Sequence, residues 1–205
     1  MPVSMSIPRR TLMALAAALL AVLAAPVLAA PVLATPVLAA TVPATTLETA
    51  GLVVLLRHAE APGTGDPPDF RLDDCAPQRT LSDDGRAQAG RIGEQLRQLG
   101  IGKASVLSSQ WCRCLETARL LDLGPVKEMS ALNSFIGNPA EEKDKTTELR
   151  QFLADLPRDG QPVVLVTHQV NITALTGIFP ASGEAILLRA NGTPNPDRID
   201  RLQTR

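Results

Sequence analysis

The two histidines of this chain each stand at the end of an apolar run. The run GLVVLLRHAE, residues 51–60, passes directly from apolar side chains into Arg57 and His58, and the run VVLVTH ends in His168. Continuous apolar runs are typical of strands in a parallel sheet that is covered on both faces. Because ligands bind at the carboxyl ends of such strands, we expect both imidazoles at one edge of a sheet.

A third basic group is expected at the same edge. The segment ASVLSS indicates a short strand, and the helix predicted after it carries Arg113 in its first turn. Arginine forks match phosphate oxygens two at a time, and helix N-termini favour anions. Since an imidazole nitrogen can attack phosphorus, this combination predicts phosphoryl transfer through a phosphohistidine, with the arginines stabilising the transferred group.

The elements that must position these residues alternate between strands and helices. Strands are expected at 51–56, 104–109, 125–129, 161–168, 184–190 and 197–202, and helices at 81–100, 110–122, 147–157 and from 171 onward. This alternation indicates an α/β fold with a mainly parallel sheet. Ser82 is expected to cap the first helix. The irregular, proline-containing stretch 59–80 is long enough to predict a functional or mobile loop.

The N-terminal segment predicts export. Arg9 and Arg10 precede the short apolar run 12–23, which is followed by low-complexity PVLAA-type repeats at 26–40. This is the pattern of a signal peptide, and the paired arginines leave a twin-arginine exporter open, as well as a retained N-terminal anchor. We expect residues 1–44 to be the signal peptide and low-complexity segment and residues 45–205 to form one domain. The mature protein is expected to be periplasmic or secreted, with no stable membrane span after cleavage.

Three cysteines remain in the mature chain: Cys75, Cys112 and Cys114. An oxidising compartment makes a bridge from Cys75 to one of the other two plausible, which leaves one thiol over. The alternative is three small buried side chains.

Composition excludes some function classes. The formal net charge is −1, so no basic excess suggests a nucleic-acid partner. Aromatic residues make up 2% of the chain and tyrosine is absent, so neither a carbohydrate platform nor a base-stacking surface is expected.

Four segments together resemble one protein family: LRHAE, LSDDGRAQA, SSQWCRCLETA and VTHQVNI, in this order. The chain resembles the histidine phosphatase superfamily, in its phosphoglycerate-mutase-like branch. The resemblance implies a three-layer α/β/α sandwich in which His58 is the phosphorylated nucleophile, while Arg57, Arg113 and His168 complete the phosphate pocket. It implies hydrolysis of a phosphomonoester or phosphoramidate on a small molecule, glycan or protein, and implies neither a metal nor a nucleotide cofactor.

The chain departs from the family at the general acid. Mutase-like members carry a glutamate in an L-N-E motif, where this chain has LNSF and therefore Ser134. Another branch carries an aspartate directly after the second histidine, where this chain has Gln169. Possible substitutes for the missing acid are Glu141, Glu142, Asp69 and Asp73.

The missing acid bears on the substrate. If no acid replaces the missing one, substrates with good leaving groups, such as phosphoramidates, are favoured. Small phosphohistidine phosphatases are similar in size to this chain, and exported members that act on lipopolysaccharide-core heptose phosphate are similar in their destination.

Three further residues are candidates for substrate binding. Ser109 could contact phosphate or only cap a helix, and Arg79 could reach the site or face solvent. Gln169 could contact phosphate through its amide or simply begin the last helix.

Two other function classes are open to test. The segments HAE and CRC partly match the zinc deaminase pattern, although their spacing is C-x-C and no proline precedes them. A binder of phosphorylated ligands that does not turn them over is the alternative on the same fold.

Overall fold

The computed structural model describes residues 47–203, which form a three-layer α/β/α sandwich. Within them a six-stranded sheet runs in the order β3-β2-β4-β1-β5-β6. The strands are β1 Leu52–Arg57, β2 Ser105–Ser108, β3 Val126–Glu128, β4 Val163–Thr167, β5 Ala185–Arg189 and β6 Asp197–Leu202. The helices are α1 Asp83–Gln98, α2 Cys112–Leu120, α3 Glu142–Asp155 and α4 Gln169–Thr176, with short 3-10 turns at Ser130–Leu132 and Pro139–Glu141. The expected signal peptide and low-complexity segment lie outside the described residues.

The sheet is mainly parallel, as predicted. Strands β3, β2, β4 and β1 pair in parallel, and β5 and β6 add two antiparallel pairings at one side. In the β1–β4 pairing Arg57 is the register partner of Thr167. The next residues along the two strands are therefore His58 and His168, and the backbone N–H of His58 donates to the Thr167 carbonyl at 2.9 Å.

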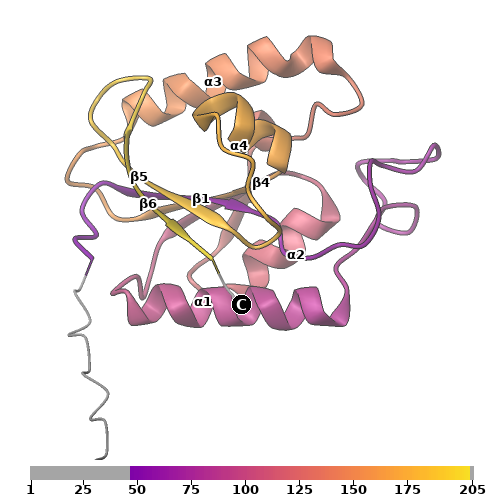
Figure 1. Cartoon of the computed structure of the whole chain (residues 1–205), viewed down its shortest axis with the longest axis horizontal. Helices are drawn as coiled ribbons and strands as arrows, with labels where there is room; N and C mark the ends of the chain where they lie inside the picture. Colours follow the sequence, from indigo (N-terminus) through magenta and orange to yellow (C-terminus); the bar gives the residue numbers. More distant parts are fainter. Residues whose placement is uncertain (1–46, 204–205) are drawn as a thin grey trace, which may run out of the picture. The chain divides into compact units, whose positions relative to one another are not determined.

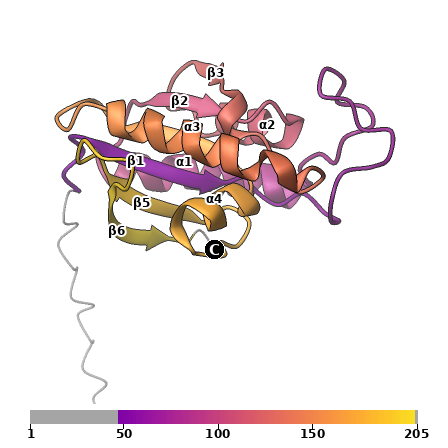
Figure 2. The same cartoon turned by 90° about the horizontal axis from the view of Figure 1, so that it is seen from above.

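Alternate residues of β1 enter opposite layers of the core. Leu52, Val54 and Leu56 pack with the buried side chains of α1 and α2, whereas Val53 and Leu55 pack with those of α3 and α4. Figures 1 and 2 show the result, with α1 and α2 on one face of the sheet and α3 and α4 on the other. A strand buried on both faces needs apolar residues throughout, which explains the uninterrupted run in the sequence.

Helix α1 begins beside the segment that follows β1. The Ser82 hydroxyl accepts a hydrogen bond from the Gly85 N–H at 2.9 Å, so Ser82 is the cap that the sequence predicted. A Cβ on Gly85 would lie 2.1 Å from the carbonyl oxygen of Glu60. Glycine at this position therefore lets the helix approach the chain just after His58.

Helix α3 begins earlier than predicted, at Glu142 rather than near residue 147. The preceding 3-10 turn has Pro139 at its start, where proline is favoured, and Lys145 pairs with Glu141 across the junction at 3.1 Å. Residues 142–146 carry no apolar side chain, so the apolar pattern begins only at Leu149.

The stretch 59–82 leaves the site edge of the sheet as a long loop and returns to α1 (Figures 1 and 2). A disulfide joins Cys75 to Cys112 at the start of α2, and Cys114 is a free, buried thiol. The structure thus selects one of the cysteine arrangements that the sequence left open. Within residues 47–203, none of the helices has the length and apolar character to span a bilayer.

Candidate active site

Two histidines and one arginine meet at the carboxyl edge of the sheet. His58 directly follows β1, His168 is the residue before α4, and Arg113 lies in the first turn of α2. The imidazole centroids of the two histidines are 5.5 Å apart. All three side chains are buried. The edge predicted from the strand ends is therefore the place where these residues gather.

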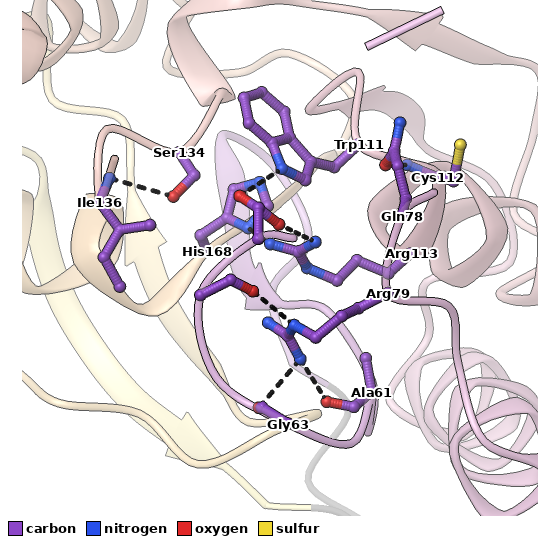
Figure 3. A network of polar contacts seen from close by, with 12 residues as sticks. Ala61, Gly63, Gln78, Arg79, Trp111, Cys112, Arg113, Ser134, Ile136 and His168 are labelled. Carbon is purple, nitrogen blue, oxygen red and sulfur yellow. Dashed lines mark hydrogen bonds and ion pairs between the residues drawn. The ribbon is translucent and has the colours of Figure 1, made fainter. Parts of the chain in front are cut away.

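Arg113 is the centre of this group. Its Nε donates to His58 Nε2 at 3.2 Å, and its Nη2 lies 3.4 Å from His168 Nδ1. Nη1 donates to Asp66 Oδ1 at 2.9 Å. Figure 3 shows Arg113 and His168 directed toward one another beside the indole of Trp111. One guanidinium thus contacts both imidazoles and one carboxylate.

The hydrogen bonds of His58 define its tautomer. Its Nδ1 lies 2.7 Å from the carbonyl oxygen of Ala59, which can only accept, so this nitrogen carries the proton. Nε2 therefore carries the lone pair, which accepts the hydrogen bond from Arg113 Nε. That lone pair is the group a nucleophilic imidazole needs.

Burial and positive neighbours keep both imidazoles neutral. Burial, and then the charge of Arg113, lowers the pKa of His58 to about 3. Burial, followed by the neighbouring His58, holds the pKa of His168 well below its usual value. Both rings are therefore uncharged at neutral pH.

Arg57 supplies a second guanidinium. Its Nη1 donates to the Pro180 carbonyl at 2.9 Å. Its Nε is buried and has no partner among the described residues. Burial, and then the charge of Arg113, lowers the pKa of Arg57. An anion between the two arginines would relieve their repulsion and satisfy this donor.

These side chains line a cavity of about 200 Å³. A larger cavity of about 700 Å³ adjoins it, and the two share Gly65, Ser134 and Ile136 in their walls. Phe70 and Trp111 stack in the wall of the larger one, with centroids 5.0 Å apart. The small inner cavity suits a phosphate group, and the outer cavity suits whatever the phosphate is attached to.

Comparison with known proteins points the same way. Residues 53–152 match the family model of the histidine phosphatase superfamily, branch 1. The chain belongs to the histidine phosphatase superfamily. This family match indicates a phosphatase, an enzyme of the hydrolase class. No curated protein matches the chain.

Solved structures share the histidine phosphatase fold with this chain. The protein histidine phosphatase SixA complexed with tungstate is 13% identical, with a TM-score of 0.54 over 74% of this chain and 96% of that one. A mycobacterial glucosyl-3-phosphoglycerate phosphatase is 19% identical, with a TM-score of 0.52 over 73% and 95%. Phosphoserine phosphatase from Entamoeba histolytica, in complex with 3-phosphoglyceric acid, is 16% identical, with a TM-score of 0.54 over 75% and 98%.

The three candidate substrate-binding residues have different positions in this histidine phosphatase. Ser109 lies behind His168, with its hydroxyl 2.8 Å from His168 Nε2, and it does not line the inner cavity. Gln169 lines the cavity, and its amide donates to Thr173 at 2.8 Å.

Arg79 also lines the inner cavity, but its guanidinium donates its hydrogen bonds to the backbone of the long loop. It donates to the carbonyls of Ala61 at 2.6 Å, Gly63 at 3.0 Å and Gly65 at 2.6 Å. Figure 3 shows the loop closed around this side chain. Burial, and then the charge of Arg113, lowers the pKa of Arg79. Arg79 therefore ties the first part of the loop to its last part, just before α1.

The acids proposed from the sequence lie away from the two histidines. Glu141 lines only the outer cavity, and hydrogen bonds from Lys145 and Asn138 lower its pKa. Glu142 lines a separate hollow on α3 and is exposed. Asp69 and Asp73 are exposed on the loop. Ser134, at the position of the family's acid, lines both cavities.

Asp66, the carboxylate that contacts Arg113, was not among the residues predicted from the sequence. Its second oxygen accepts from the Trp111 indole N–H at 3.0 Å. Its position results from the path of the loop, and its only signal in the sequence is an acid in a long loop that follows the nucleophile segment. The zinc deaminase alternative requires Cys112 as a zinc ligand. Cys112 is joined to Cys75 in a disulfide, so its sulfur is not available for a metal.

Proposed function

We propose that this phosphatase hydrolyses phosphomonoesters or phosphoramidates in two steps through a phosphohistidine on His58. The observation that carries the proposal is the tautomer of His58. With Nδ1–H held by the Ala59 carbonyl, Nε2 presents a lone pair beside Arg113 and lines the inner cavity.

In the first step the hydrogen bond from Arg113 Nε to His58 Nε2 breaks, and Nε2 attacks phosphorus. The N–P bond forms as the bond from phosphorus to the leaving group breaks, and the positive charge gained by the ring is stabilised by the Ala59 carbonyl at Nδ1. Water then attacks phosphorus, the N–P bond breaks, and Nε2 regains its lone pair as inorganic phosphate leaves.

Arg57, Arg113 and His168 hold the non-bridging oxygens during both steps. The buried Nε of Arg57 provides a donor that has no partner among the described residues, whereas Arg113 turns donors that now contact His58 and Asp66 toward the phosphate. His168 bears its proton on Nε2, where it donates to Ser109. A phosphate dianion favours a second proton on His168 Nδ1, which then donates to a phosphate oxygen.

The substrate is a phosphorylated small molecule, glycan or protein. Support comes from the open outer cavity and from the variety of related folds, which includes phosphatases named for a protein histidine, a glucosyl-phosphoglycerate and phosphoserine. We further propose that residues 1–44 direct export to the periplasm or beyond. The apolar segment after Arg9 and Arg10 and the Cys75–Cys112 disulfide support this.

The test is to trap the phosphoenzyme. The purified protein is mixed with p-nitrophenyl phosphate, quenched under alkaline conditions that preserve phosphohistidine, and mapped by mass spectrometry. We expect phosphate on His58, and a loss of turnover of at least roughly 10³-fold in His58→Ala. Binding of phosphate without phosphoenzyme or turnover would instead establish the non-catalytic binder.

A further inference from the structure

An alkyl phosphate cannot be hydrolysed quickly unless its leaving oxygen receives a proton. In this chain the residues at the two acid positions of the family are engaged otherwise. The Ser134 hydroxyl accepts from the Ile136 N–H at 3.3 Å, and the Gln169 amide donates to Thr173. Neither side chain is an acid, so the proton must come from another group.

Asp66 lies at the boundary between the two cavities. It lines the outer cavity, and its neighbour Gly65 lines both. Its side chain is 15% exposed. One oxygen contacts Arg113 Nη1, and the Nε of the same guanidinium contacts the nucleophilic nitrogen of His58. The carboxylate therefore lies between the outer cavity and the guanidinium of the proposed phosphate pocket.

Asp66 and Glu141 are the carboxylates, among the described residues, that line these two cavities. Both line only the outer cavity, and both form an ion pair, Glu141 with Lys145 at 3.1 Å and Asp66 with Arg113 at 2.9 Å. Of the two, only Asp66 contacts a residue of the proposed phosphate pocket.

The position of Asp66 is fixed from several sides. Arg79 binds the carbonyls of the loop up to Gly65, the residue before Asp66. The Trp111 indole N–H holds one carboxylate oxygen. The disulfide from Cys75 to Cys112 ties the same loop to the helix that carries Arg113. A group that transfers protons in catalysis requires this kind of fixed support.

We propose that Asp66 is the general acid and base of this site, an assignment that rests on the proposed function. A substrate phosphate that arrives as the monoanion takes over Arg113 Nη1 and passes its own proton to the Asp66 carboxylate. As the N–P bond to His58 forms and the P–O bond breaks, this proton passes to the leaving oxygen. The carboxylate then takes a proton from the attacking water as the N–P bond breaks.

The assignment defines the substrate class. A chain with a working acid at this boundary hydrolyses esters of alkyl alcohols, whose leaving groups occupy the outer cavity beside Phe70 and Trp111. A restriction to phosphoramidates and activated esters is then not expected.

The test compares two leaving groups in Asp66→Asn, which keeps the shape and removes the acid. The substrates are 2,4-dinitrophenyl phosphate, which needs no proton on departure, and benzyl phosphate, which does. Rapid-mixing measurements give the rate of phosphoenzyme formation from each. In Asp66→Asn we expect phosphoenzyme formation to be about 10²–10⁴-fold slower with benzyl phosphate and little changed with the dinitrophenyl ester. The dinitrophenyl ester should then show a burst followed by slow turnover, because the base for the attacking water is missing.

The matched control is Asp69→Asn, on the same loop, because Asp69 is exposed and lines neither cavity. It should retain the wild-type rates with both esters. If Asp66→Asn slows phosphoenzyme formation equally with both esters, Asp66 is only a positioning residue. If it speeds the reaction equally with both esters, Asp66 only competes with phosphate for Arg113. Either result overturns the proposal. If the wild-type protein forms no phosphohistidine, the proposed function itself is contradicted. If all variants form a phosphohistidine and Asp66→Asn depends on the leaving group as the wild type does, only the role of Asp66 is contradicted.

Discussion

His58 and His168 lie side by side, with ring centroids 5.5 Å apart, because the residues that precede them are register partners on adjacent parallel strands. Each imidazole enters the pocket from the end of a strand that is buried on both faces. The rigid pairing of β1 with β4 therefore sets the spacing of the site, and burial of the strand ends sets the charge of the rings.

The first prediction concerns the pH at which His58 gains a proton. Protonation removes the lone pair of Nε2, so it stops the reaction. Because the pKa of His58 is lowered from 6.5 to about 3, the ring of the free protein stays neutral throughout pH 5–7. NMR titration of the two histidines, assigned with His58→Asn, should show no midpoint near 6.5 for His58. A midpoint at the ordinary value would show that the ring is hydrated.

The second prediction concerns stability against acid. In the unfolded chain His58 takes up a proton near pH 6.5, whereas in the folded chain it does so near pH 3. The unfolded state therefore binds more protons between these values, and the free energy of unfolding falls as the pH is lowered through this window. Each such histidine contributes a slope of up to about 1.4 kcal/mol per pH unit.

Urea unfolding of wild type and His58→Asn between pH 7.5 and 4.5 measures this slope. Asparagine does not titrate, so the variant should lose less stability on acidification than the wild type. Carboxylates contribute equally to both proteins, so the difference isolates the histidine. Parallel curves would contradict the buried, neutral imidazole.

Ser109 is predicted to act through His168. The His168 Nε2–H donates to the Ser109 hydroxyl at 2.8 Å, and that hydroxyl donates to Asn133 at 3.2 Å. Ser109→Ala should cost about 1 kcal/mol of folding stability and lower kcat, because the ring loses the bond that fixes its tautomer. Steady-state kinetics should show kcat falling with KM little changed. Ser134→Ala, in the wall of both cavities, is the control and should have a smaller effect on kcat.

Much of this arrangement could be predicted from the sequence because it depends on strong local signals. Two apolar runs ending in histidines defined the central strands, and Ser82 before an amphipathic segment defined the start of α1. Parallel strands bring their carboxyl ends to one edge, so the meeting of His58, Arg113 and His168 followed from the strand assignment.

Asp66 and the beginning of α3 could not be predicted in this way. The position of Asp66 is set by the backbone carbonyls that Arg79 binds and by a disulfide, and neither leaves a periodic pattern in the sequence. The first turn of α3 is exposed and charged, so no apolar side chain indicates it. Tertiary contacts between distant segments decide both features.

The last prediction concerns the disulfide between Cys75 and Cys112. It closes a segment with a sequence separation of 37 residues, which includes the end of the long loop and all of α1. Restricting the unfolded chain over a loop of this size stabilises the folded state by roughly 3–4 kcal/mol. The double variant Cys75→Ser/Cys112→Ser should therefore unfold at a clearly lower urea concentration. A reductant should shift the wild type toward the double variant and leave the double variant itself unchanged. If wild type and double variant unfolded at the same concentration, the noncovalent contacts of the loop would suffice to hold it, among them the hydrogen bond from the Cys112 N–H to Gln78 at 3.0 Å.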